Sequence, residues 1–136
     1  MGITTTVRDV MTRELITVEA ADRVKKVIDL MVKRNIGSVV VTKNGKPVGI
    51  VTEKDIMRSV CPEELCTRGI EAGEIMRSPL ITVPVDAKLG EAALLMVEKN
   101  VKRLLVEEKG SVVGIITHKD LIKGTLDTFM ALAMVS

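Results

Sequence analysis

The polar residues that could do chemistry recur at equivalent places along the chain. Thr52 and Asp55 form a Thr-x-x-Asp sequence after an apolar run, and Thr117 and Asp120 repeat it. An aspartate at such a strand-to-helix junction has two uses. It can be favoured by the helix dipole while the threonine caps the helix by accepting a hydrogen bond from a first-turn amide, or it can accept both hydroxyls of a ribose beside the anion-attracting helix start. The residues alone leave both interpretations open.

Catalytic groups are scarce. The chain has a single histidine, His118, and its two cysteines, Cys61 and Cys66, have no neighbouring base. With no further ligands in reach a zinc site is not expected, and the cysteines are interpreted as buried apolar residues, with a disulfide as the alternative. No Gly-rich loop of the nucleotide-hydrolase type precedes a helix. We therefore expect a binding protein that is not an enzyme and has no metal site.

The composition limits the class of ligand and the cellular location that we expect. One Phe and neither Trp nor Tyr leave no platforms for base stacking, and a net charge of +2 is too small for a general polyanion surface. A nucleic-acid partner is therefore not expected, and phosphate recognition has to be local. No apolar run is long enough to span a bilayer, and residues 1–6 lack the pattern of a signal peptide. We expect a soluble, cytoplasmic protein without a membrane partner.

The main signal is an internal repeat. Residues 10–58 align without a gap on residues 75–123, with seventeen of the forty-nine positions identical. Each copy predicts a strand, an amphipathic helix, a hairpin and a second helix, in the order β-α-β-β-α. The signals in the first copy are the strand Leu15-Ile16-Thr17-Val18, the apolar stripe Val24, Val27, Ile28, Met31 and Val32, the helix end at Asn35, the turn Asn44-Gly45 and a helix start near Lys54; those in the second are Leu80 to Val83, the stripe Leu89, Ala92, Ala93, Met96 and Val97, Asn100, the turn Lys109-Gly110 and a start near Lys119.

The repeat predicts an α/β fold. One motif of about 50 residues buries too little surface to be stable alone, so we expect the two motifs to pack sheet to sheet with pseudo-twofold symmetry. Residues 1–66 are expected to hold the first motif with the N-terminal segment and the connection, and residues 67–136 the second motif. The apolar tail from Leu126 to Val135 is expected to continue the last helix.

The two copies differ where a ligand would be recognised. Lys102 and Arg103 replace Gly37 and Ser38 of the first copy, and His118 replaces Glu53. With Lys119 these residues form a basic group near Asp120, which predicts that one of two clefts between the motifs is richer in phosphate-binding donors. The alternative interpretations are a solvated charge pair at residues 102 and 103 and a half-exposed loop histidine without a ligand.

These motifs resemble a known family. The Met-Thr/Arg opening with Leu-Ile-Thr-Val, the Asn-Ile/Val before the second strand and the closing Gly-Ile-Val/Ile-Thr-x-x-Asp are similar to tandem cystathionine β-synthase (CBS) domains, a pair of which forms a Bateman module. The resemblance covers residues 7–124. It implies a sensor that binds adenosine-containing ligands in clefts between the motifs.

The resemblance also implies roles for individual residues. Asp55 and Asp120 would take the ribose hydroxyls, with Thr52 and Thr117 beside them. The Thr-His-Lys sequence of residues 117–119 is similar to one in the regulatory γ subunit of AMP-activated kinase, where the histidine contacts phosphate, and Arg103 stands where that subunit has a phosphate-binding arginine. The positions that would line the base are Ile16, Thr17, Val18, Ile81, Thr82 and Val83. Ser38 and Glu53 depart from the basic pattern, so the first cleft is expected to be weak or to take a less charged ligand.

Taken together, the residues and the resemblance predict a regulatory protein that binds AMP, ADP or ATP and changes its affinity for an unidentified partner protein through linkage. A homodimer is expected, because modules of this family tend to pair. Two alternatives remain: an interaction module in which the clefts are unused and the aspartates serve only as helix caps, and a sensor of S-adenosylmethionine or NAD.

Overall fold

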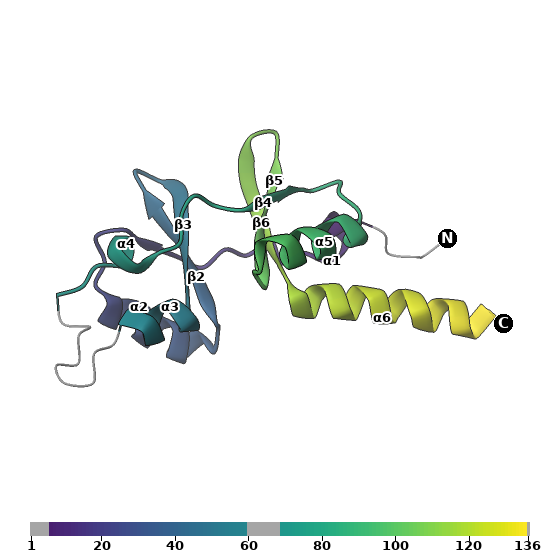
Figure 1. Ribbon diagram of the computed structural model, residues 1–136, viewed down its shortest axis with the longest axis horizontal. Helices are drawn as coiled ribbons and strands as arrows, with labels where there is room; N and C mark the ends of the chain where they lie inside the picture. The colour runs from purple at the N-terminus through teal and green to yellow at the C-terminus, as the bar shows by residue number, and fades with distance from the viewer. Residues whose placement is uncertain (1–5, 60–68, 136) are drawn as a thin grey trace. The chain divides into compact units, whose positions relative to one another are not determined.

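The computed structural model describes residues 6–59 and 69–135 and divides into two compact units (Figure 1). One unit, Ile16–Leu80, contains strands β1 to β3 and is called the β1–β3 unit. The other, Met1–Leu15 with Ile81–Ser136, contains strands β4 to β6 and is called the β4–β6 unit. Cys61 and Cys66 lie outside the described residues.

Both units have the expected succession of elements. The β1–β3 unit has β1 (Thr17–Glu19), α2 (Val24–Arg34), β2 (Ser38–Lys43), β3 (Lys46–Thr52), α3 (Glu53–Ser59) and α4 (Ala72–Ile75). The β4–β6 unit has α1 (Val7–Val10), β4 (Thr82–Pro84), α5 (Leu89–Lys99), β5 (Arg103–Glu108), β6 (Ser111–Thr117) and α6 (His118–Val135). Each sheet is mixed: the first strand is parallel to the second, which is antiparallel to the third. This confirms the predicted α/β fold and the continuation of the last helix.

The local stop and turn signals act as predicted. Asn35 and Asn100 end helices α2 and α5 in the left-handed conformation, with φ of 52° and 54°. At the two hairpins, Asn44-Gly45 and Lys109-Gly110 have positive φ at both central residues, as a type I′ turn requires. The two turns, together with a β-bulge after Val41 and another after Val106, set the register that brings the ends of β3 and β6 beside the starts of β2 and β5.

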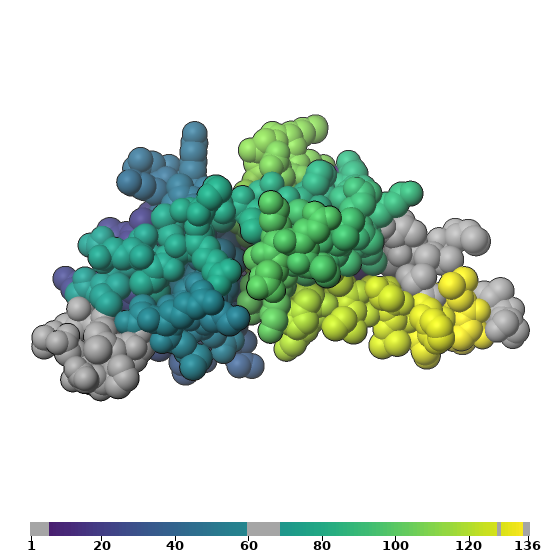
Figure 2. Space-filling view, viewed as in Figure 1, coloured from purple at the N-terminus to yellow at the C-terminus, as the bar shows by residue number. Residues whose placement is uncertain are grey.

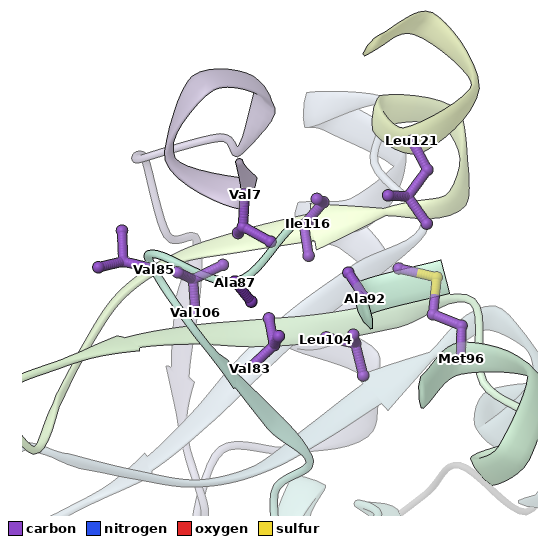
Figure 3. Close-up of a cluster of buried hydrophobic side chains, with 10 residues drawn as sticks. All are labelled: Val7, Val83, Val85, Ala87, Ala92, Met96, Leu104, Val106, Ile116 and Leu121. Carbon is purple, nitrogen blue, oxygen red and sulfur yellow. The ribbon is translucent and has the colours of Figure 1, made fainter. Parts of the chain in front are cut away.

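Each unit has a hydrophobic core of its own. In the β4–β6 unit, side chains from the sheet, α5 and the start of α6 surround Leu104, Val106 and Ile116, and Val7 of α1 points into the same cluster (Figure 3). In the β1–β3 unit the corresponding cluster includes Val27, Val39 and Ala72 of α4. The apolar stripes of α2 and α5 are narrower than predicted.

Val32 and Val97, which the sequence assigned to those stripes, are 76% and 77% exposed. Both lie at the edge of the buried face of their helix, whose buried residues are Val24, Val27 and Met31 in α2 and Ala92 and Met96 in α5.

The short leading helices pack with the opposite repeat. Val7 and Arg8 of α1 donate their backbone N–H groups to the carbonyls of Ala87 and Val85, at 2.8 and 3.0 Å. In Figure 1 this purple helix accordingly lies with the green elements. Each unit is thus built from the strands of one repeat and the leading segment of the other. These units are not the two sequence motifs, whose division between residues 66 and 67 stays a prediction from the order of the repeats.

Helix α4 makes the equivalent contacts in the β1–β3 unit. Ala72 N donates to Asp22 O at 2.7 Å, and Gly73 N donates to Ala20 O at 2.9 Å. Because residue 72 is equivalent to residue 7 in the repeat, the two exchanges are matched.

Arg8 also ties the leading segment to the β4–β6 unit through its side chain. Its guanidinium donates to Glu108 at 2.7 Å and to Asp86 at 3.3 Å. The hydrogen bonds to Glu108 and then to Asp86 raise the pKa of Arg8 above its ordinary value.

Helix α6 continues beyond the strands of its unit, as the yellow segment in Figures 1 and 2 shows. Its exposed side chains include Leu126, Phe129 and Met130. None of the described helices is both long and apolar enough to cross a membrane. Nor do the described residues contain a group of three His, Cys, Asp or Glu side chains placed to hold a metal ion.

Candidate functional site

The junction of β6 and α6 is built around Asp120. The Thr117 amide donates to Asp120 Oδ2 at 2.9 Å, and the Asp120 amide donates to Thr117 Oγ1 at 3.2 Å. These reciprocal bonds are those of a helix cap, which agrees with the capping interpretation. They use one carboxylate oxygen only, and Oδ1 has no hydrogen-bond or ion-pair partner in the part of the chain that the structure describes.

The basic residues predicted to bind phosphate lie at this same junction. Arg103 stands opposite Thr117 in the antiparallel register of β5 and β6, and the carbonyl of Lys102 accepts the His118 amide at 2.9 Å. Alternation along the strands places Arg103 and Thr117 on the sheet face away from the core residues Leu104 and Ile116. The hairpin thus brings Arg103 opposite the threonine that precedes Asp120 by three residues, although seventeen positions separate Arg103 from Asp120 in the sequence.

His118, the first residue of α6, is half-buried. Its Nδ1 atom is buried and lacks a hydrogen-bond partner within the described residues. A buried ring nitrogen without a partner is unfavourable unless another group satisfies it. Lys119 follows His118 directly and is exposed, and the exposed Lys102 is linked to His118 through its backbone carbonyl. These lysines give the junction a local excess of positive charge.

At the equivalent junction of β3 and α3, the aspartate has different partners. Asp55 Oδ2 accepts from the Thr52 amide at 2.9 Å and from the Thr52 hydroxyl at 3.0 Å. Its Oδ1 accepts from Arg77 Nε at 3.2 Å, and Asp55 is only 5% exposed. Arg58 Nη1 lies 4.0 Å from the same oxygen. Both carboxylate oxygens of Asp55 are therefore used within its own unit.

Sequence reasoning overlooked Arg77. The signal was present in the repeat, because Arg77 occupies the position at which the first copy has Thr12. That difference acquires a meaning only when Arg77 is known to pair with the strand that precedes Asp55, through the Ile50 amide and carbonyl.

The two strand segments predicted to line the base occupy mixed environments. Val18 and Val83 point into the hydrophobic cores of their units, at 5% and 2% exposure, so that their backbone alone could meet a ligand. Ile16 and Ile81 pack against the same cores from partly buried positions.

Thr17 is exposed, and the Thr82 hydroxyl is half-buried and donates to Glu107 at 3.3 Å. Thr82 pairs with Leu105, two residues from Arg103 on β5, so Thr82 shares a sheet face with Arg103. In the first copy, Ser38 stands opposite Thr52 and Glu53 is exposed.

The profile of the CBS domain matches residues 7–61 and again residues 72–127. An uncharacterized protein of Methanocaldococcus jannaschii, MJ1404, is 40% identical over 90% of this chain, which spans 32% of that protein. The chain spans 61% of an uncharacterized protein of Methanopyrus kandleri and 24% of a homoserine O-acetyltransferase of Methanococcus vannielii, at 34% and 32% identity. These first curated relatives are thus substantially longer than the matched region, and CBS domains also occur in enzymes.

Solved structures agree with the fold. An uncharacterized conserved protein from Pyrococcus horikoshii superposes with a TM-score of 0.82 at 35% identity, covering 92% of this chain and 95% of that one. The CBS domain pair of protein MJ0100, solved with 5-methylthioadenosine and S-adenosyl-L-methionine, has a TM-score of 0.77 at 27% identity, with 88% and 94% covered. CBSX2, solved with AMP, has a TM-score of 0.77 at 26% identity, with 90% and 96% covered.

Two matches to the domain profile, at the two copies of the internal repeat, account for 111 of the 136 residues (55 in 7–61 and 56 in 72–127). The solved relatives share this fold, with TM-scores of 0.77 to 0.82. The chain belongs to the CBS-domain family and contains two CBS domains in tandem.

Proposed function

We propose that this chain binds an adenine nucleotide, AMP, ADP or ATP, beside the start of α6 and acts as a regulatory sensor for a partner protein. The observation that carries the proposal is Asp120, whose Oδ1 has no partner among the described residues, at a junction where Arg103 stands opposite Thr117. The ligands named for CBSX2 and for the MJ0100 domain pair support an adenosine compound. No catalytic step is assigned to these residues.

In the proposed complex the ribose hydroxyls donate to Asp120, and the phosphate lies toward Arg103, Lys102, His118 and Lys119. Hydrogen bonds to a charged acceptor contribute roughly 1.5–3 kcal/mol each. Arginine offers a planar pair of donors that matches phosphate oxygens. The Thr117 and Thr82 side chains lie on the same face of the sheet and are proposed to contact the ribose and the base.

The test is a melting panel with AMP, ADP, ATP, S-adenosylmethionine and NAD. A ligand present at about 100 times its Kd stabilises the folded state by about 2.7 kcal/mol. Stabilisation by S-adenosylmethionine or NAD alone would replace the nucleotide by that ligand. An unchanged melting temperature with all five compounds contradicts the proposal.

Asp120→Asn separates ligand binding from capping. The amide oxygen of Asn still accepts the Thr117 N–H, but the negative charge is lost, so binding is expected to weaken at least tenfold while the free protein melts nearly as before. Asp127→Asn is the matched control, because Asp127 is exposed on the same helix. A variant that loses stability but keeps its affinity would show that Asp120 is only a cap.

We also propose that the chain forms a homodimer through exposed apolar helix faces. The described residues include ten large apolar side chains that are more than half exposed, namely Val32, Met57, Leu94, Val97, Ile122, Leu126, Phe129, Met130, Leu132 and Met134. Isolated exposed apolar residues are normal, but gathering on neighbouring turns marks an interaction surface. Light scattering of the wild type and of Phe129→Glu tests this: a monomeric wild type contradicts it, and a Phe129→Glu variant that stays dimeric excludes α6 from the interface.

A further inference from the structure

Arg77 and Thr12 hold equivalent places in the two units. Arg77 exchanges two backbone hydrogen bonds with Ile50, at 2.8 and 3.1 Å, and Thr12 exchanges two with Ile115, at 2.8 and 2.9 Å. Residues 12 and 77 are equivalent in the repeat, as are residues 50 and 115. The exchange of leading segments therefore sets an arginine beside the β3 end and a threonine beside the β6 end.

Two glycines make this placement possible. A Cβ at Gly49 would lie 2.5 Å from Met76 Sδ and 3.0 Å from the Arg77 carbonyl oxygen. A Cβ at Gly114 would lie 2.7 Å from the Thr12 carbonyl oxygen. Since both segments pass this close to the third strand, the backbones at residues 77 and 12 are fixed, and the two positions differ in their side chains.

The side-chain difference decides what each aspartate can accept. Arg77 neutralises Asp55 and occupies Oδ1, while Thr52 occupies Oδ2 with two donors. A ribose that donates two hydroxyls to Asp55 would have to displace the guanidinium from a carboxylate that is 5% exposed. Exchanging a charged donor for neutral hydroxyls in such a place is unfavourable.

Asp120 has no such cation. Thr12 is uncharged, and its side chain makes no hydrogen bond to Asp120 in the described part of the chain. The carboxylate has one oxygen without a partner among the described residues, which is what a second diol hydroxyl requires.

We infer that Arg77 is a specificity-determining residue that acts as an internal ligand of Asp55, so that the chain binds one nucleotide, at Asp120, and the identity of residues 12 and 77 decides which half binds. This inference rests on the proposed function. It also changes the reason for the unequal sites: the sequence comparison ascribed it to phosphate-binding donors, whereas Arg77 acts at the ribose position.

The test exchanges the two residues and counts AMP molecules bound per chain by isothermal titration calorimetry. The wild type is expected to bind one AMP. Arg77→Thr is expected to bind two, with the Kd of the first site changed less than about threefold, and Thr12→Arg is expected to bind none. The double exchange is expected to bind one AMP that Asp55→Asn abolishes and Asp120→Asn leaves bound.

Two control variants separate charge and size from position. Lys46→Thr removes a positive charge from the same unit as Arg77 at an exposed hairpin residue, and it is expected to leave one AMP bound. Thr12→Gln lengthens residue 12 without adding charge, and it is also expected to leave one AMP bound. If Arg77→Thr does not fold, Thr12→Arg with Thr12→Gln still decides the matter, because residue 12 is exposed and partners no buried charge.

The outcomes distinguish the two levels of the proposal. A wild type that binds two AMP molecules, an Arg77→Thr variant that still binds one, or a Thr12→Arg variant that binds as the wild type does contradicts the role of residues 77 and 12 and leaves the nucleotide proposal standing. A wild type that is stabilised by no compound of the melting panel contradicts the proposed function itself.

Discussion

Replacing Gly114 by alanine tests whether the leading segment of the chain is held as tightly as the contacts indicate. The added Cβ would lie 2.7 Å from the Thr12 carbonyl oxygen and 3.0 Å from Met11 Sδ. The sulfur can move aside, because it ends a flexible side chain. The Thr12 carbonyl cannot, because Thr12 is hydrogen-bonded to Ile115 through both its amide and its carbonyl.

The expected loss of stability follows from the hydrogen bonds that the added Cβ would disturb. Moving the Thr12 backbone away breaks or stretches two hydrogen bonds, each with a net contribution of about 0.5–1.5 kcal/mol. Alanine lowers the entropy of the unfolded chain and returns about 0.4–1 kcal/mol. We therefore expect Gly114→Ala to lower the free energy of unfolding by about 1–2 kcal/mol.

Urea unfolding followed by far-UV circular dichroism measures this change. Gly90→Ala in α5 is the matched control: its Cβ would meet nothing within 4 Å, so a stabilisation of about 0.5–1 kcal/mol is expected from helix propensity. A Gly114→Ala variant as stable as the wild type would refute the close approach of the leading segment to β6. A gain of stability in Gly90→Ala together with a loss in Gly114→Ala would support the close approach.

Two smaller predictions concern the turn and the ion pairs of the β4–β6 unit. Lys109→Asn gives the second hairpin the Asn-Gly turn of the first at a residue with φ of 53°, and it should raise the free energy of unfolding in urea by about 0.5 kcal/mol; a loss of stability would contradict the type I′ assignment. Arg8→Ala removes the ion pairs with Glu108 and Asp86 and should lower stability more in dilute buffer than in 1 M NaCl, where exposed charges are screened; an effect independent of salt would show that packing, not charge, holds Arg8.

Features that depend on a few neighbouring residues were predictable from the sequence. The ends of α2 and α5 at Asn35 and Asn100 and the turn at Asn44-Gly45 follow from backbone preferences that no distant contact overrides. The pairing of Arg103 with Thr117 could not be derived from the turn alone, because a β-bulge between Val106 and Glu107 shifts the register by one residue. Repetition strengthened each signal by presenting it twice.

The exchange of the leading segments was not predictable. Val7 and Ala72 are small apolar residues at equivalent positions, one buried in each core. Their type alone therefore does not indicate the unit against which α1 or α4 packs. The role of Arg77 was hidden for the same reason: its partner Asp55 is twenty-two residues away along the chain, in a segment with which the repeat order did not pair it. The width of the helix faces, overestimated at Val32 and Val97, likewise depends on what covers each helix.

Gly49→Ala connects the backbone position of Arg77 to the number of ligands bound. Its Cβ would meet Met76 Sδ at 2.5 Å, which a side-chain rotation can relieve, and the Arg77 carbonyl oxygen at 3.0 Å, which requires the backbone to shift by a few tenths of an ångström. The loss of stability should therefore be smaller than at Gly114, about 1 kcal/mol or less.

The shift of the Arg77 backbone would lengthen the hydrogen bond between Arg77 and Asp55. The distance of 3.2 Å between Arg77 Nε and Asp55 Oδ1 is already at the long end for an N–H···O bond, so further displacement weakens the hold of Arg77 on the carboxylate. Calorimetry should then reveal a second, weaker AMP site in Gly49→Ala, abolished by Asp55→Asn, with the first site unchanged. A different result is possible: Arg77→Thr binds two AMP molecules, but Gly49→Ala binds only one. In that case the Arg77 guanidinium stays bonded to Asp55 when the backbone of residue 77 shifts, and the position of that backbone does not control the Asp55 site.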